Sequence, residues 1–237
     1  MEHPSRALAF DFGASSGRAI LGTFDGETIR IEEVHRFSND PVAIRGTLYW
    51  DVLRQYYEIK QVCSKQSSTV ALTPLAVDTW GVDFGLLDEG GYLLDNPVHY
   101  RDQRTKGLVE ESFKSIPQEE FYQLTGIQLM ELNTVFQLMA LKRQRPALLE
   151  RAKTLLFMPD LFNYLLTRQK ANGVHHCLHF TAAGRTDGRL VGRGAAFALE
   201  SPKYFDADRS CREACRATGT VDPVRELGLP PAQVVTV

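Results

Sequence analysis

The chain has 237 residues, of which 43% are hydrophobic and 24% are charged, and its formal net charge at pH 7 is −2. This composition is ordinary for a globular protein, and the near-neutral charge gives no electrostatic basis for binding nucleic acid or an anionic membrane. No apolar run approaches the length of a membrane span and no secretory signal precedes Arg6, so we expect a cytoplasmic protein. The four cysteines form no CxxC pair, which argues against a disulfide framework.

A meander of three antiparallel strands is predicted at the start of the chain. The apolar run that begins at Ala7 ends in Asp11, and after a turn of small residues the strand pattern resumes over 19–24. The turn D-G-E then leads to T-I-R-I-E-E-V-H-R-F, which alternates with the period of a strand. Asp51 is placed to cap a helix that runs through Val62.

Strands and helices alternate in the middle of the chain. P-L-A-V-D-T-W is typical of a short buried strand, and G-V-D-F-G-L-L-D-E-G-G-Y-L-L predicts a hairpin that turns at the Gly-Gly pair. Helical spacing follows over Gln118–Thr125, Thr134–Gln144 and Pro159–Thr167, with a short strand at Leu155–Met158 before the last helix. The presence of both periods predicts a mixed α/β protein.

The turn between the first two strands has the composition of a phosphate-binding loop. Two glycines allow backbone amides to face a ligand, two serines add hydroxyl donors, and an arginine adds charge. The candidate residues are Gly13, Ala14, Ser15, Ser16, Gly17 and Arg18. Asp11 is a candidate for holding the Mg²⁺ that accompanies a nucleotide. Alone, the same residues are also what an ordinary hairpin uses, and they match neither the P-loop nor the dinucleotide fingerprint.

The order and spacing of five segments resemble those of the FGGY carbohydrate kinases. The segments are D-F-G-A-S-S-G-R, D-T-W-G-V-D-F, H-Y-R-D-Q-R-T, L-N-T-V-F-Q-L and M-P-D-L-F-N-Y-L-L-T. Within the family the likeness is strongest to the rhamnulokinases, which use MgATP to phosphorylate L-rhamnulose on its 1-hydroxyl. The resemblance covers residues 6 to about 172. It implies a ribonuclease-H-like domain of the actin/hexokinase-like ATPase fold, with a mixed sheet and helices on its faces.

The resemblance also implies roles for single residues. The turn at 13–18 would meet the phosphates of ATP, and Asp11 would serve the Mg²⁺. Gly81 would contact the sugar, with Trp80 and Asp83 lining its pocket, because an aromatic face suits the C–H face of a polyol while a carboxylate binds its hydroxyls. The remaining residues implied at the sugar are Arg101, Asp102, Asn133 and Gln137.

Each of these residues also has a structural interpretation. Trp80 and Asp83 are also consistent with a core aromatic and a turn carboxylate. The R-D-Q-R-T loop that contains Arg104 is also typical of a salt-bridged surface turn, and Asn133 and Gln137 could cap and solvate their helix. Phe136 stands where the rhamnulokinases tend to have tyrosine, which makes the identity of the ketose less definite.

Segment 173–217 departs from the family pattern. It is rich in glycine, arginine and histidine and has no period. Read one base later, a back-translation from Gly173 permits Glu-Tyr-Thr-Ile-Ala-Ser-Thr-Ser-Gln-Leu and then Asp-Ala-Arg-Thr-Gly-Gly-Trp, which suits the family. We therefore interpret the segment as translated out of frame and expect it to be poorly ordered. The alternatives are a divergent insertion and a metal site, although its histidines and cysteines match no common zinc spacing.

Residues 218–237 resemble the family again, as the end of the N-terminal domain whose main part is 1–172. In the family a His-Asp-Thr segment follows, whose aspartate is the catalytic base, and then the second domain. We expect both to lie beyond Val237. The sequence thus predicts a rhamnulokinase-like enzyme of rhamnose catabolism, present as an inactive N-terminal fragment without a catalytic residue. The alternatives are another FGGY kinase, for xylulose, fuculose or gluconate, and a non-catalytic sugar-binding or actin-like module.

Overall fold

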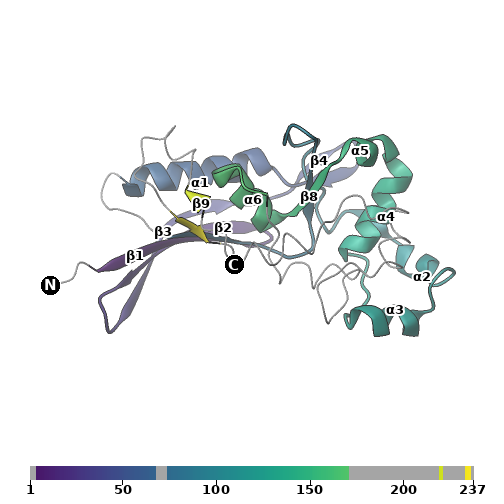
Figure 1. The fold of residues 1–237 in the computed structure, drawn as a ribbon, viewed down its shortest axis with the longest axis horizontal. Helices are drawn as coiled ribbons and strands as arrows, with labels where there is room; N and C mark the ends of the chain where they lie inside the picture. The colour runs from purple at the N-terminus through teal and green to yellow at the C-terminus, as the bar shows by residue number, and fades with distance from the viewer. Residues whose placement is uncertain (1–3, 68–73, 171–218, 221–232, 236–237) are drawn as a thin grey trace.

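The chain begins with an antiparallel meander, as the strand period predicts (Figure 1). The computed structural model describes residues 4–67, 74–170, 219–220 and 233–235. The meander consists of β1 (Ser5–Phe12), β2 (Ser16–Phe24) and β3 (Ile29–Ser38). Successive side chains of a strand point to opposite faces, and the buried face of β1 consists of Leu8, Phe10 and Phe12. Strand alternation therefore gives the sheet one apolar face.

The meander is half of a mixed six-stranded sheet whose order is β3-β2-β1-β6-β10-β9. β6 (Leu75–Asp78) runs parallel to β1 on one side and to β10 (Gln233–Val235) on the other. β9 (Gly219–Thr220) is antiparallel to β10. Parallel neighbours require a long connection, and α1 (Val52–Ser67) lies in the connection that leads from the meander to β6.

Two helices cover the apolar face of the sheet. α1 and α6 (Met158–Thr167) lie above it (Figure 1), and the Tyr56 hydroxyl of α1 donates to the Leu165 carbonyl of α6 over 3.1 Å. The ring of Phe162 stacks on that of Phe12 at a centroid distance of 5.1 Å. Each fully buried aromatic or branched side chain in this core contributes about 1.5–3 kcal/mol. The apolar stripes of the two helices thus determine how they pack on the sheet.

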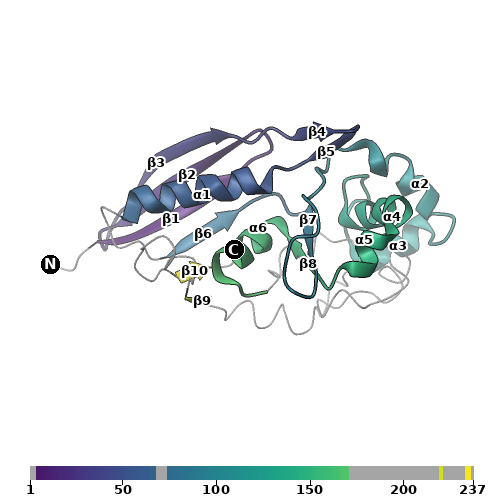
Figure 2. The same cartoon turned by 90° about the horizontal axis from the view of Figure 1, so that it is seen from above.

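A second group of elements lies beside the sheet and has its own core (Figure 2). β7 (Phe84–Leu87) pairs antiparallel with β8 (Thr154–Phe157). The helices here are η1 (Gln103–Thr105), α2 (Leu108–Ser112), α3 (Gln118–Thr125), α4 (Thr134–Gln144) and α5 (Pro146–Arg151). The separate hairpin of β4 (Val42–Ile44) and β5 (Thr47–Tyr49) leads into α1. The loops that carry most of the predicted sugar residues therefore emerge where the two groups meet.

Most of the predicted elements are confirmed, and the helix cap at Asp51 forms, since its Oδ1 accepts from the Arg54 amide at 3.1 Å. The predicted Gly-Gly hairpin is confirmed, although its second arm is short. The turn has Gly91 at φ +81°, and across it the Asp88 amide donates to the Tyr92 carbonyl at 3.0 Å and the Leu94 amide donates to the Leu86 carbonyl at 2.9 Å. β7 also forms a ladder with β8, because both strands are mostly apolar and can be buried together.

Two predictions concern residues that the structure does not describe. Segment 173–217 lies outside the described residues, so its predicted lack of order and the domain limits drawn around it stay predictions. Among the described residues, no helix combines the length and the apolar character that crossing a bilayer requires.

Candidate functional site

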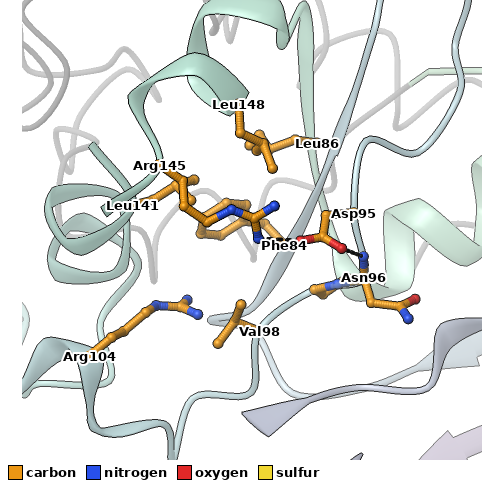
Figure 3. Close-up of a pocket in the computed structure, with 10 residues that line it drawn as sticks. Phe84, Leu86, Asp95, Asn96, Val98, Arg104, Leu141, Arg145 and Leu148 are labelled. Atoms are coloured by element: carbon orange, nitrogen blue, oxygen red, sulfur yellow. Dashed lines mark hydrogen bonds and ion pairs between the residues drawn. The ribbon is translucent and has the colours of Figure 1, made fainter. Parts of the chain in front are cut away.

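The second group of elements contains a small pocket between β7, α4 and α5 (Figure 3). Its floor is apolar, with Phe84 and Leu148, and at its edge Arg145 pairs with Asp95. The volume of about 30 Å³ has room for about one water molecule. This pocket is too small for a sugar.

A larger hollow lies at the predicted cleft loop. It has a volume of about 570 Å³, which is in the usual range for small-molecule sites. Arg101 and Asp102 line one side, and residues 129–132 line the other. Of the predicted sugar residues, these two face this hollow, and only Arg101 is exposed there.

Asp83 is fully buried and all its contacts are internal. Its Oδ2 accepts from the indole Nε1 of Trp50 at 2.6 Å and from the Tyr100 amide at 3.1 Å. Its Oδ1 accepts from Nε2 of Gln137 at 2.8 Å. Burial raises the pKa of the Asp83 carboxyl to about 6, although these hydrogen bonds and the nearby Arg104 act to lower it.

Three other predicted sugar residues also use their side-chain polar atoms in hydrogen bonds within the protein. Gln137 accepts from Nη2 of Arg104 at 2.7 Å, while its own Nε2 donates to Asp83 and to the Leu132 carbonyl. Oδ1 of Asn133 accepts from the Met130 amide at 2.6 Å. The two carboxylate oxygens of Asp102 accept from the amides of Leu48 and Arg104, each at 2.9 Å. All three are buried, so the structure brings them together as a scaffold.

Trp80 and Gly81 are partly exposed at the end of β6. One face of the Trp80 ring stacks on Trp50 at a centroid distance of 3.8 Å. The indole Nε1–H of Trp80 is itself buried and has no acceptor among the described residues, so the exposed part of Trp80 is elsewhere on its side chain or backbone. Of the predicted sugar residues, Trp80, Gly81 and Arg101 are therefore the ones that keep surface for a ligand.

The turn between β1 and β2 is closed by a residue that the sequence pattern did not reveal. The Gly13 amide donates to the Ser16 carbonyl at 2.9 Å. Buried Asn39 then donates two hydrogen bonds to the turn. Its side-chain Nδ2 donates to the Gly13 carbonyl at 2.7 Å, and its backbone amide donates to the Ser15 carbonyl at 3.0 Å. The amides of Ala14 and Ser15 donate to no acceptor among the described residues. These two amides are the groups in the turn that fit a phosphate oxygen.

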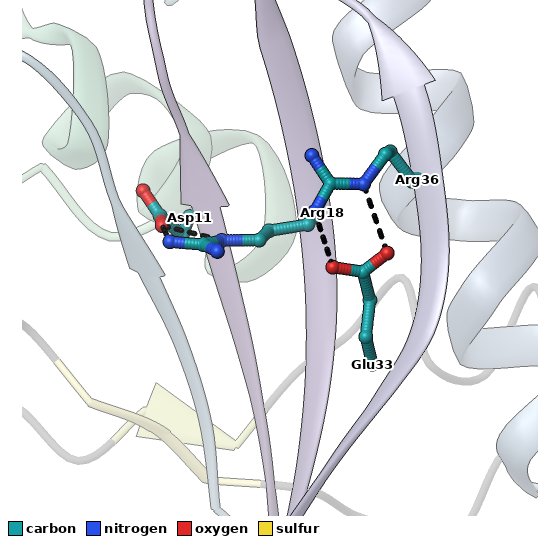
Figure 4. A network of polar contacts seen from close by, with 4 residues as sticks. All are labelled: Asp11, Arg18, Glu33 and Arg36. Atoms are coloured by element: carbon teal, nitrogen blue, oxygen red, sulfur yellow. Dashed lines mark hydrogen bonds and ion pairs between the residues drawn. The ribbon is translucent and has the colours of Figure 1, made fainter.

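Asp11 and Arg18 stand opposite each other on β1 and β2 and form an ion pair (Figure 4). The Nη2–Oδ2 distance is 2.6 Å, and the side chains are 46% and 41% exposed for Arg18 and Asp11. On the next strand Arg36 pairs in the same way with Glu33. The predicted metal ligand and the predicted phosphate-binding arginine thus contact each other, and both stay accessible.

The residues around Asp11 fit a hydrated Mg²⁺ that travels with ATP. Its Oδ1 lies outside the pair with Arg18. On the other side of β1, Asp78 of β6 occupies the neighbouring register position and is exposed. Hard cations prefer such carboxylate oxygens, directly or through water. Within the described residues, no group of three acidic, histidine or cysteine side chains forms a complete metal site.

Gly17 is required by packing. A Cβ on Gly17 would lie 2.2 Å from Cζ of Phe37, and real Cβ atoms essentially never approach another atom so closely. The prediction assigned Gly17 to phosphate binding, and no contact of the described residues tests that assignment.

Comparison with known proteins agrees with this geometry. The model of the N-terminal domain of the FGGY family of carbohydrate kinases matches residues 6–188, which extends past residue 172, where the resemblance was expected to end. A rhamnulokinase from Oceanobacillus iheyensis is 45% identical over 166 residues, covering 70% of this chain and 35% of the relative. One from Halalkalibacterium halodurans is 43% identical over 167 residues, covering 70% of this chain and 36% of the relative. The chain thus spans about a third of the length of these curated relatives.

Solved structures extend the comparison to the fold. The xylulose kinase from Rhodospirillum rubrum superposes with a TM-score of 0.79 at 20% identity, over 98% of this chain and 49% of the other. The gluconate kinase from Lactobacillus acidophilus gives a TM-score of 0.80 at 11% identity, over 99% of this chain and 48% of the other. The protein has the mixed α/β architecture of the actin/hexokinase-like ATPases, and it belongs to the FGGY family of carbohydrate kinases.

Proposed function

We propose that the chain is the sugar-side part of a cytoplasmic ATP-dependent kinase that transfers the γ-phosphate of ATP to the 1-hydroxyl of L-rhamnulose, in rhamnose catabolism. The observation that carries the proposal is the 39–45% identity to four rhamnulokinases. The same stretch of chain contains the D-T-W-G-V-D-F segment, in which Trp80 and Gly81 are partly exposed.

On the sugar side, the proposal assigns contact to the residues that keep free surface. Trp80 offers an aromatic face to the C–H face of the ketose, and the Gly81 backbone approaches closely because no side chain intervenes. Arg101 donates from the rim of the hollow to sugar hydroxyls. The buried members of the same site hold its loops in place through hydrogen bonds within the protein; they are Asp83, Asp102, Asn133 and Gln137.

On the nucleotide side, the proposal assigns the phosphates to the turn at 13–18. The amides of Ala14 and Ser15 donate to phosphate oxygens, and the two serine hydroxyls add further donors. Arg18 exchanges Asp11 for a phosphate oxygen, at small cost because an exposed ion pair is worth only about 0–1 kcal/mol. Asp11 is then free to hold a Mg²⁺-bound water; the ion, when bound, neutralises phosphate charge.

Fluorescence titration of the 237-residue chain tests the sugar assignment. We expect L-rhamnulose to change the tryptophan emission, with weak affinity, and D-xylulose and glycerol to change it less. The Trp80→Phe variant is the control, because it keeps the buried Trp50 but removes the accessible ring, and it should not respond. Equal responses to all three ligands would point to another FGGY kinase, and no response to any would favour a non-catalytic module.

A further inference from the structure

Trp50 is the residue in this site that neither the sequence pattern nor the family resemblance singled out. It lies between β5 and α1 and is fully buried. Its backbone amide donates to the Pro97 carbonyl at 2.9 Å, so its main chain is fixed to the loop that leads into the R-D-Q-R-T segment. Trp50 therefore contacts the sugar-side loops on their buried side.

Three aromatic rings from separate parts of the chain form a stack with Trp50 in the middle. Trp80 lies on one face at a centroid distance of 3.8 Å and an interplanar angle of 24°. His99 lies on the other face at 3.9 Å and 23°. The ring of Trp80 thus rests on Trp50, and the position of Trp50 affects where the partly exposed Trp80 ring lies.

Stacking alone does not fix Trp50 within its own plane, because stacked rings can slide and rotate at little cost. The bond from Nε1 of Trp50 to Oδ2 of Asp83, at 2.6 Å, supplies the missing constraint. Asp83 is in turn held by the Tyr100 amide and by Gln137. A buried hydrogen bond to a charged acceptor contributes about 1.5–3 kcal/mol, which is enough to select one orientation.

The charged and titratable groups around Asp83 come from the loop that precedes α2. Arg104 of η1 is the cation nearest to it, linked through Gln137. Asp102 lies beside Arg104, and the Arg101 guanidinium lies over the Tyr100 ring. Burial lowers the pKa of His99 to about 4, so its ring is neutral at pH 7 and adds no charge.

We propose that Trp50 is a positioning residue: its hydrogen bond to Asp83 sets the orientation of the Trp80 ring and thereby shapes the sugar-facing surface. The role given to Trp80 rests on the proposed function, whereas the coupling between Asp83, Trp50 and Trp80 does not. Asp83 accordingly acts through Trp50, and not by binding a hydroxyl.

The Trp50→Phe variant tests the proposal, because phenylalanine keeps an aromatic ring in the stack but has no N–H donor. The chain contains two tryptophans, so the variant leaves Trp80 as the only one. We expect acrylamide to quench Trp80 more readily in this variant than in a Trp50→Tyr variant that keeps a polar hydrogen, and the affinity for L-rhamnulose to fall about tenfold. Tyr164→Phe, which removes the distant bond to the Gly91 carbonyl, is the matched control and should change neither quantity.

A pH titration of fluorescence gives a readout that loss of packing alone would not move. In the unaltered protein we expect tryptophan emission to change with a midpoint near pH 6, as Asp83 titrates, and Asp83→Asn should abolish this change. Because the Trp50 hydrogen bond lowers the pKa of Asp83, Trp50→Phe should move the midpoint upward.

The outcomes separate the two proposals. A Trp50→Phe variant with wild-type quenching and affinity, or an Asp83→Asn variant with wild-type quenching and affinity, would refute the positioning role. The Asp83→Asn comparison leaves Trp50 in place, so the proposal stays testable even if Trp50→Phe does not fold. If the midpoint moves as expected but no sugar binds, the coupling stands and the proposed function fails.

Discussion

Gly17 offers a clear test of why a glycine stands in the β1–β2 turn region. Its strand is extended and its φ is not positive, so alanine would bring no backbone strain. The added Cβ, however, would meet the Phe37 ring at 2.2, 2.5 and 2.9 Å. The ring has little room to move, because it packs edge-on against Phe12 at 5.3 Å and stacks on His35 at 5.7 Å.

The expected size of the effect follows from two opposing terms. Replacing a strand glycine by alanine normally stabilises by about 0.5–1 kcal/mol, since it reduces the entropy of the unfolded chain. Forcing a methyl group into a filled core typically costs about 1–3 kcal/mol. With a contact as short as 2.2 Å, we expect the second term to win and Gly17→Ala to lower the free energy of unfolding by about 1–2 kcal/mol.

Urea unfolding, followed by circular dichroism, measures this change. Gly22→Ala is the matched control on the same strand, because its Cβ would lie 3.8 Å from the Ala7 carbonyl and should leave the protein as stable or more stable. Adding Phe37→Leu to Gly17→Ala should recover part of the loss, which a double-mutant cycle would report as coupling. If Gly17→Ala unfolds at the wild-type urea concentration but no longer responds to MgATP, the glycine serves the phosphate and the packing argument is wrong.

Three further outcomes are expected. Asp83→Asn should remove a pH dependence of stability, because burial raises the pKa of Asp83 to about 6 in the folded protein. The stabilising contribution of protonated Asp83 is full below its unfolded pKa and is lost as the pH rises through 6, on the order of 3 kcal/mol. Urea titrations of the protein and the variant at pH 4 and 7 measure this loss, and a difference in free energy of unfolding that is the same at both pH values would contradict it. Asp11→Asn should change the free energy of unfolding by less than about 1 kcal/mol, because the pair with Arg18 is exposed, yet calorimetry should show weaker MgATP binding. The 237-residue polypeptide assayed alone should not phosphorylate L-rhamnulose, and a rate in the usual kinase range of roughly 1–100 per second would show that a base lies within it.

The sequence pattern predicts the elements of this fold well where local signals are strong. The alternation in the meander and the helical spacing over 118–125 and 134–144 reappear in the structure. The pairing of β7 with β8 could not be read in the same way. Both strands are short, mostly apolar runs, and the local turn at Gly91 already gives β7 a nearer partner. Their pairing depends on burial that only the folded chain creates.

The candidate site was predicted by residue type more than by role. A carboxylate near a tryptophan fits both a sugar ligand and a buried acceptor, and only the geometry shows that Asp83 receives three protein donors. Trp50 and Asn39 left no local signal, since each acts on a segment far away in sequence. Buried polar groups must be hydrogen-bonded, but the identity of their partners is a tertiary property.

The position of β6 between β1 and β10 has a consequence for the synthesis of the protein. β1 and the meander leave the ribosome first, whereas β10 begins only at Gln233, long after Asp78 has ended β6. At roughly 5–20 residues per second, one edge of β6 waits on the order of ten to thirty seconds for its partner. An open strand edge invites pairing with other chains, and β6 limits this risk by being four residues long and by ending in an exposed carboxylate. Slower translation should therefore lower the soluble yield, and a chaperone that shields nascent chains should restore it.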